Sequence, residues 1–234
     1  MAGPAMGGEA ALERALALNP DLAEARAIKS RRLSNVGRHE EAAAEIALAL
    51  RLDPESYEVN LRAAAINYSQ GSLAEAVPYY EKASALSDSD LAAPFFLVSC
   101  YTALGDRENT RRVAQISLAR SEKAVAQDRT NGFAMGGGVF ALAALGEAER
   151  AKDWMSRALL IDPDNLRMRY NFACALAGML GERDAALDML GPVLERGELG
   201  LVETLATDPD LASLRDDPTF QAKVAEAEAR LAAA

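Results

Sequence analysis

The chain has 234 residues, of which 50% are apolar and 6% aromatic, and its formal net charge is −10. This acidic balance argues against nucleic acid and anionic membranes as partners, because both attract clusters of Lys and Arg. Apolar runs stay short of the roughly 20 residues that span a bilayer, the N-terminus does not resemble a signal peptide, and two cysteines make no disulfide framework. We therefore expect a cytoplasmic protein, and the abundance of Ala, Leu, Glu and Arg predicts an all-α fold.

Turn markers recur along the chain. The segments "ALNPDL" and "RLDPES" place Pro20 and Pro54 34 residues apart, and Asp88 stands where the next proline would fall. Glycines alternate with these breaks, first at intervals of 34 and later at 41 and 35 residues. Stretches with helical apolar spacing lie between the markers, so each unit is predicted to be a helix, a glycine turn, a second helix and a Pro or Asp turn. The glycines are Gly37, Gly71, Gly105, Gly146 and Gly181.

Two helix starts carry a further signal. Asp21 with Glu24, and Ser72 with Glu75, have the spacing of capping boxes. In that motif the first side chain accepts a hydrogen bond from a free backbone N–H of the first helical turn. We therefore predict side-chain caps at Asp21 and Ser72.

A helix–turn–helix unit of 34 residues with small side chains at fixed positions resembles the tetratricopeptide repeat (TPR) family. That family places a small residue of the first helix against an alanine early in the second helix. The matching pairs are Ser30 with Ala42, Ala64 with Ala76, Val139 with Ala151, and Ala173 with Ala186, and the later alanines of the pattern are Ala49, Ala83, Ala124 and Ala158. The resemblance implies a right-handed α-solenoid of about five and a half repeats with a C-terminal helical cap. The expected divisions are a flexible lead at 1–8, a half repeat at 9–22, repeats at 23–56, 57–90, 91–131, 132–165 and 166–199, and capping helices at 200–234.

The repeat at 91–131 is irregular, because seven extra residues follow Gly105. Seven residues are about two helical turns, so we predict a long second helix from about Arg107 to Gln127. The next segment, "NGFAMGGGVF", contains the run Gly136–Gly138. It lacks the preceding strand and the following Lys-Ser or Lys-Thr of a phosphate-binding loop. We interpret the run as a close contact between helices.

The first predicted helix, at residues 9–18, matches the second helix of a repeat, and no first helix precedes it. Leu12, Ala15 and Leu16 form an apolar stripe on one side of this helix. Burying one leucine contributes roughly 1.5–3 kcal/mol. We therefore expect the stripe to be covered, either by upstream sequence of a longer protein or by a second copy in a homodimer.

The repeat period stops after Gly197. Asp217 and Pro218 predict the N-cap and first position of a final capping helix, at about Pro218–Leu231. The segments "ALAALGEAERAKDWMSRALLIDPDNLRMRYNFACALA" and "DPDLASLRDDPTF" also resemble the C-terminal repeat region of bacterial class III adenylate and guanylate cyclases and of related signalling proteins. That resemblance spans about residues 132–222 and concerns the repeats alone, since nothing in it matches the paired metal-binding carboxylates of a cyclase.

Isolated polar residues offer little chemistry. The single histidine, His39, has no neighbouring Cys, Ser or carboxylate arrangement for catalysis or a metal. Cys100 and Cys174 fall in first helices two repeats apart, so we expect buried, unpaired thiols. Four aspartates near the C-terminus lack the glycine and glutamate of a calcium loop and are interpreted as helix caps: Asp208, Asp210, Asp216 and Asp217. We predict no enzymatic activity, no metal and no cofactor.

The TPR resemblance implies a concave groove lined by the first helix of each repeat. The Lys and Asn pattern that clamps a peptide carboxylate is not matched, because the nearest residues are scattered along the chain. Large apolar and aromatic residues in a groove would anchor a partner, but they could also pack between helices. Both interpretations stay open for Phe95 and Phe133, and packing is favoured for Phe140. The predicted groove residues are Leu61, Tyr68, Phe95, Phe133, Phe140, Tyr170, Arg31, Asn35 and Arg167.

These observations favour a non-catalytic scaffold that binds a helix or extended segment of a protein partner in the groove. The alternative is a regulatory or self-associating C-terminal TPR domain of a larger bacterial signalling enzyme, such as an adenylate or guanylate cyclase. A catalytic domain directly upstream would favour the alternative.

Overall fold

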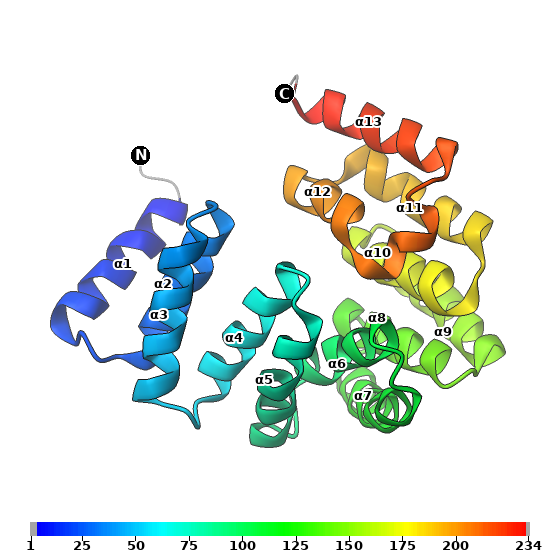
Figure 1. The fold of residues 1–234 in the computed structure, drawn as a ribbon. Coiled ribbons are helices and arrows are strands. Elements are labelled where there is room, and N and C mark those ends of the chain that lie inside the picture. Colours follow the sequence, from blue (N-terminus) through cyan, green and yellow to red (C-terminus); the bar gives the residue numbers. More distant parts are fainter. Residues whose placement is uncertain (1–3, 233–234) are drawn as a thin grey trace. The chain divides into compact units, whose positions relative to one another are not determined.

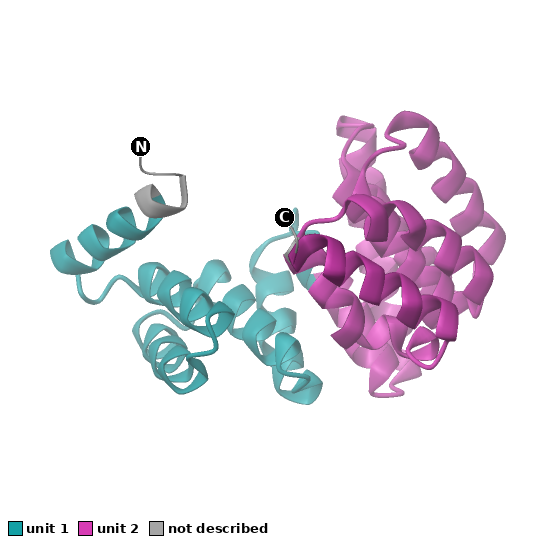
Figure 2. Cartoon of the chain, turned by 90° about the horizontal axis from the view of Figure 1, so that it is seen from above, with its two compact units in different colours: residues 1–93 teal, residues 94–234 magenta. Residues whose placement is uncertain are grey.

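The computed structural model describes residues 4–232, and this part of the chain contains helices and turns without any strand (Figure 1). The chain divides into two compact units, residues 1–93 and 94–234, which Figure 2 colours separately. Unit 1 contains α1 (Pro4–Leu18), α2 (Ala23–Asn35), α3 (His39–Leu52), α4 (Tyr57–Ser69) and α5 (Leu73–Leu86). Unit 2 contains α6 (Ala92–Ala103), which begins just before the boundary, α7 (Arg107–Gln127), α8 (Gly132–Ala144), α9 (Ala148–Ile161), α10 (Leu166–Ala175), the π-helix η1 (Leu176–Leu180), α11 (Arg183–Arg196), α12 (Leu199–Thr207), the 3₁₀-helix η2 (Pro209–Leu214) and α13 (Pro218–Ala232). The predicted all-α class is confirmed.

Consecutive helices pack in pairs. In unit 1, α2 packs against α3 and α4 against α5, while α2 and α4 lie side by side. In unit 2, α8 packs against α9 and α10 against α11, while α8 and α10 lie side by side. We call the first helices of the pairs the A helices, and the side of each unit that they form its A face. The A helices are α2 and α4 in unit 1 and α8 and α10 in unit 2, and we include α6, to which the repeat pattern assigns the same position.

Small side chains bring the paired helices together. Ser30 of α2 and Ala42 of α3 are fully buried, and the Ser30 hydroxyl donates a hydrogen bond to the Ala42 carbonyl at 2.6 Å. The other three predicted pairs are also fully buried: Ala64 with Ala76, Val139 with Ala151, and Ala173 with Ala186. The positions at which the TPR resemblance places small facing residues are therefore all buried in the structure.

All five predicted glycine turns adopt left-handed backbone angles. Gly37, Gly71, Gly105, Gly146 and Gly181 have φ between 70° and 78°. A Cβ atom added at any of them would meet no atom within 4 Å. Glycine is therefore needed for the backbone angle, which costs other residues strain, and not for space.

Replacing Gly71 by alanine is expected to lower the free energy of unfolding by about 1–2 kcal/mol, because alanine strains the left-handed turn. Gly200→Ala is the matched control, since Gly200 lies in α12, is exposed and would meet nothing within 4 Å with its added methyl group. The control is expected to gain about 0.5–1 kcal/mol from helix propensity. Urea titrations followed by circular dichroism would measure both, and equal effects of the two substitutions would contradict this account.

The two irregular repeat intervals are absorbed inside helices. The seven extra residues lengthen α7, which has the predicted bounds Arg107–Gln127. The interval of 35 residues between Gly146 and Gly181 contains one extra residue, and the π-helix η1 lies within it. A π-helical turn holds one residue more than an α-helical turn, so it accommodates a single insertion without breaking the helix.

The predicted capping boxes are not formed. The N-cap of α2 is Leu22, not Asp21, and Ser72 begins α5 without accepting a hydrogen bond through its side chain. Side-chain caps are instead found at Ser56, Asn131 and Asn165, which begin the A helices α4, α8 and α10. At the start of α5 the chain leaves the tight turn at Gly71 with the Ser72 backbone at φ −81° and ψ 65°, away from the extended angles typical of a capping residue.

The two ends differ from each other. The flexible lead predicted at 1–8 is wrong for residues 4–8, which belong to α1, and residues 1–3 lie outside the described part of the chain. At the other end, Asp217 accepts hydrogen bonds from the backbone N–H groups of Thr219 and Phe220, so it is the predicted cap of α13. Helix α13 packs on α11, and Arg230 donates to the Leu194 and Gly197 carbonyls.

Among residues 4–232, no helix combines the length and the apolar character required to cross a bilayer.

Candidate functional site

The A face of unit 2 carries a short segment from the C-terminal part of the chain, residues 208–214. Asp208 begins it by accepting the backbone N–H of Asp210 at 2.9 Å, and Pro209 starts the 3₁₀-helix η2. A 3₁₀-helix has three residues per turn, so Leu211 and Leu214 point to the same side. Both leucines are fully buried. The segment is therefore anchored by one apolar edge, and it packs against α10 and η1.

Polar side chains of the A helices bind this segment. The Tyr170 hydroxyl of α10 donates a hydrogen bond to the Asp208 carboxylate. The Ser99 hydroxyl of α6 donates to the Asp210 carboxyl group, at 3.2 Å from each oxygen. Within the segment, Ser213 donates to the Ala177 carbonyl at 3.3 Å. The segment is thus held by hydrogen bonds from two A helices as well as by its leucines.

The π-helix η1 provides a flat contact for the segment. A Cβ atom at Gly178 would lie 2.9 Å from the backbone oxygen of Asp210, closer than real Cβ atoms approach other atoms. Only glycine allows the segment backbone to come this near. The one-residue insertion of the last repeat and its glycine therefore both lie where the segment docks.

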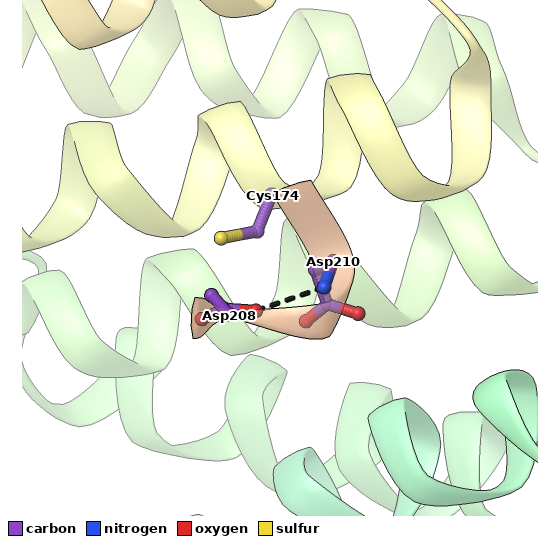
Figure 3. Close-up of side chains that lie close together, drawn as sticks. All are labelled: Cys174, Asp208 and Asp210. Atoms are coloured by element: carbon purple, nitrogen blue, oxygen red, sulfur yellow. Dashed lines mark hydrogen bonds between the residues drawn. The ribbon is translucent and has the colours of Figure 1, made fainter. Parts of the chain in front are cut away.

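The two carboxyl groups of the segment lie beside the thiol of Cys174 (Figure 3). The thiol of Cys174 and the carboxyl oxygens of Asp208 and Asp210 lie within 4.8 Å of one another. Burial, and then the neighbouring Asp208, raise the pKa of Asp210 to about 8. Burial also raises the pKa of Asp208, against the lowering effect of the Tyr170 hydrogen bond. At pH 7, Asp210 therefore holds its proton.

The same burial governs the thiols. It raises the pKa of Cys174 well above the ordinary value, and the pKa of Cys100 to about 12, with nearby Asp210 adding to both shifts. A cation would bind this trio only after Cys174 and Asp210 had lost their protons, and the surroundings oppose both losses. We therefore interpret Cys174, Asp208 and Asp210 as a cluster of acidic groups whose carboxyl groups are held by hydrogen bonds from Tyr170 and Ser99. As predicted, both cysteines are buried and unpaired.

The predicted groove is not open in unit 2. Phe95, Phe140 and Tyr170 are buried, with 7%, 0% and 7% of their surfaces exposed. This burial agrees with the packing favoured for Phe140, decides for packing at Phe95, where both interpretations were open, and shows that the groove anchor predicted at Tyr170 is wrong. The Phe95 ring packs on Phe140 at a centroid distance of 4.9 Å and on Phe133 at 5.8 Å. Tyr170 is covered by the 208–214 segment. Of the predicted set in unit 2, Phe133 remains half-buried and Arg167 exposed.

The glycine run of α8 explains how the aromatic residues become buried. An added Cβ would lie 2.7 Å from Asn171 at Gly136, 3.1 Å from Ser121 at Gly137, and 2.6 Å from Trp154 at Gly138. These three neighbours belong to α10, α7 and α9. The run therefore lets three helices approach α8 closely, which agrees with the contact interpretation made from the sequence.

In unit 1 the predicted groove residues remain accessible. Arg31 and Asn35 are exposed on α2, one helical turn apart. Leu61 and Tyr68 are half-buried on the adjacent α4, and the Tyr68 ring meets the buried Tyr80 edge to face at 6.4 Å. Because α2 and α4 lie side by side, these four residues share the A face of unit 1.

The predicted self-association residues lie at a surface hollow. Leu12, Ala15 and Leu16 of α1 are half-buried, because α2 packs against one side of α1. Helix α2 therefore covers part of the stripe, and cover of the remainder by upstream sequence or by a second copy stays a prediction. The hollow between the two helices has a volume of about 520 Å³. Its lining includes Leu12, Leu16, Leu33 and Val36, with Glu9 and Glu13 on α1 and Lys29, Arg32 and Arg38 on the α2 side.

Sequence reasoning missed the docking of residues 208–214. It interpreted Asp208, Asp210, Asp216 and Asp217 as caps, which is correct for Asp208 and Asp217 only. Asp210 binds Ser99 instead, and Asp216 is exposed. A usable signal was present: Ser99, Tyr170, Cys174 and Gly178 all occupy positions that the repeat pattern assigns to the inner face.

Comparisons with known proteins support the fold. No protein-family model and no curated protein matches the chain. Among solved structures, a thermophilic TPR protein of Thermus thermophilus, TTC0263, is 19% identical with a TM-score of 0.55, and the match covers 88% of this chain and 99% of that one. YrrB, described as a TPR protein with an unusual peptide-binding site, is 21% identical with a TM-score of 0.51, and the match covers 82% and 95% of the two chains. The predicted TPR-type solenoid fold is therefore confirmed, while the resemblance to a cyclase C-terminal region stays a prediction.

Proposed function

We propose that the chain is a non-catalytic protein-interaction module and that a partner segment binds the A face of unit 1. The observation that carries the proposal is the contrast between the two A faces. In unit 1 the predicted groove residues Arg31, Asn35, Leu61 and Tyr68 are exposed or half-buried, whereas three of the four predicted aromatic residues of unit 2, Phe95, Phe140 and Tyr170, are buried. The peptide-binding site named for YrrB, which shares the fold, supports a peptide as the kind of ligand.

The chemistry of this face suits a mixed partner segment. Leu61 and Tyr68 offer apolar surface on α4, and a tyrosine ring is an effective anchor because its contact area is large and its rotamer entropy small. Arg31 offers a guanidinium that can bind a carboxylate through two parallel hydrogen bonds. We therefore expect segments in which an apolar side chain stands near an acidic one.

Selection from a displayed peptide library against the whole chain would test the proposal. Selected peptides are expected to lose about tenfold or more in affinity with Arg31→Glu, because a desolvated Arg–carboxylate pair is replaced by like charges. Arg51→Glu is the matched control, since Arg51 is exposed on α3 and the charge change is identical. Fluorescence anisotropy would measure both variants, and equal affinities of the two variants for the selected peptides would refute binding at this face.

The hollow between α1 and α2 favours a second candidate function, self-association. Its α1 rim is acidic, with Glu9 and Glu13, and its α2 rim carries Arg32 together with Lys29, which also pairs with Glu45 of the same chain. A surface with both signs on opposite rims is complementary to itself under a two-fold axis. Two copies could then bury the apolar lining while each acidic rim meets the basic rim of the other copy.

Analytical ultracentrifugation is expected to show a concentration-dependent dimer of the chain. Leu12→Glu with Leu16→Glu should shift it to monomer, because charges would enter the apolar contact. Ala10→Glu with Ala11→Glu adds the same charge at exposed positions of α1 and should leave the dimer intact. A monomer at every concentration, or a dimer that survives the leucine substitutions, would exclude this candidate.

A further inference from the structure

The 208–214 segment is held in the way that proteins hold a peptide ligand. It contributes two buried leucines three residues apart, and its two carboxyl groups receive hydrogen bonds from Tyr170 and Ser99. Its backbone touches Gly178, where any other residue would collide. Apolar anchors, polar side chains that fix the register and a close backbone approach together make a built binding site.

We infer that the A face of unit 2 is a binding site for short acidic segments, in which residues 208–214 are an internal ligand that an external segment of similar chemistry can replace. The inference rests on the proposed function and deepens it, because it adds a second site and names its ligand. The expected ligand has a proline between two acidic residues, followed by two leucines three residues apart. This expected ligand sequence is taken from the chain's own segment "DPDLASL", residues 208–214.

A neighbouring hollow favours an acidic ligand. About 660 Å³ of open space adjoins Gly178 and is lined by Arg107, Arg111 and Met179, among others. Both arginines are exposed at the start of α7. A ligand with acidic residues beyond the docked core would reach these guanidinium groups, which the internal segment leaves to solvent. An external ligand can therefore make contacts that the internal one lacks.

The internal ligand is also suited to release. It is a single 3₁₀-helix of six residues, joined through Asp208 to α12 on one side and followed by a turn at 215–216 on the other, so few backbone hydrogen bonds are lost when it leaves. Docking brings two half-buried carboxyl groups close together, and desolvation followed by the neighbouring Asp208 raises the pKa of Asp210, so docking favours proton uptake by Asp210. That proton uptake weakens the docked state relative to the free one.

The two native cysteines report release directly. Both are buried, and Cys174 lies under Asp208 and Asp210. Alkylation of Cys174 by iodoacetamide at constant pH, located by mass spectrometry, measures how often the segment leaves. In the unchanged chain we expect alkylation to depend only weakly on low urea concentrations, because a local opening exposes little surface. A urea dependence as steep as that of global unfolding would overturn the inference.

Gly178→Ala is the sharpest variant, because its methyl group occupies the space of the Asp210 backbone while alanine favours the helix. We expect alkylation of Cys174 to become about tenfold faster or more, with unchanged helix content. Gly200→Ala adds the same methyl group at an exposed position of α12 with nothing within 4 Å and should leave the rate unchanged. Equal rates in the two variants would overturn the inference.

Binding in trans tests replacement itself. A fluorescent peptide of residues 205–216 is added to the whole chain carrying Leu211→Ser and Leu214→Ser, in which the internal ligand has lost its anchors but the site is intact. We expect this variant to bind the peptide at least about tenfold more tightly than the unchanged chain does, because its site is vacated. Adding Gly178→Ala to the variant should abolish the binding. A peptide that binds neither chain, or that ignores Gly178→Ala, overturns the inference.

Failure here is distinguishable from failure of the proposed function. If library-selected peptides still depend on Arg31 while the 205–216 peptide fails, only the second site is lost. If the serine variant loses its helical circular dichroism, the urea dependence of Cys174 alkylation in the unchanged chain still decides between local release and global unfolding.

Discussion

Phe140→Ala is expected to lower the free energy of unfolding of unit 2 by about 3–5 kcal/mol, the usual loss for a large aromatic ring removed from a core. The ring is fully buried, and its centroid lies 4.9 Å from that of Phe95. The glycine run of α8 brings neighbouring helices so close that little relaxation can fill the cavity. Urea unfolding of the whole chain, followed by circular dichroism, would measure the loss.

Phe133→Ala is the comparison for this prediction. Phe133 belongs to the same aromatic cluster, with its centroid 5.8 Å from Phe95, but it is only half-buried. Its removal should cost less than half as much, because less apolar area is returned to water. If Phe140→Ala costs no more than Phe133→Ala, the ring does not belong to the core and the groove interpretation of Phe140 regains support.

Asp210→Asn is expected to stabilise unit 2 at neutral pH by on the order of 1 kcal/mol or more, because asparagine never carries the charge that desolvation and Asp208 disfavour, and each pKa unit corresponds to about 1.4 kcal/mol. The folded pKa of Asp210 is about 8, whereas its ordinary value is 3.8. Between these values the folded chain keeps the proton that the unfolded chain has lost. Stability from this group is therefore complete below about pH 4, falls as the pH rises toward 8, and changes no further above that. Asparagine is neutral at every pH, so Asp210→Asn removes the contribution of this residue to the pH dependence of the free energy of unfolding.

Unfolding measured from pH 5 to pH 9 would check the prediction. Asp208 titrates beside Asp210 and its pKa is also raised, so the unchanged chain should lose stability over this range and the asparagine variant should lose less. Asp216→Asn makes the same change at an exposed position and is expected to have little effect. A slope that persists in Asp210→Asn, with no gain at pH 7, would show that Asp210 is not the buried acid described.

The repeat architecture could be predicted because its signals are local. A left-handed turn strongly favours glycine, so the spacing of Gly37, Gly71 and Gly105 revealed the helix pairs directly. The seven-residue insertion could only lengthen a helix by whole turns, which led to the correct bounds of α7. Asp217 before Pro218 marked the start of α13 for the same local reason.

Other local signals misled, because a pattern does not include the backbone angles around it. Ser72 stands where a capping box would begin, but the turn at Gly71 delivers the chain with other angles, and no side-chain cap forms. The inner-face assignment of Tyr170 was correct in position and wrong in exposure, because the repeat pattern does not show what else covers that face.

The sequence by itself determined the helix pairs, their turns and the faces on which the small residues meet, since all of these depend on neighbours within about 34 positions. The tertiary structure alone decided which face is open. The hydrogen bond between Ser99 and Asp210 joins residues 111 positions apart, and no periodic pattern relates them. Their contact depends on how the chain turns after α12 and on the room left by Gly178. The segment docks because burying the apolar side chains of Leu211 and Leu214 is favourable. The surface that receives these leucines exists only after the helices have packed, so it cannot be inferred from the order of residues.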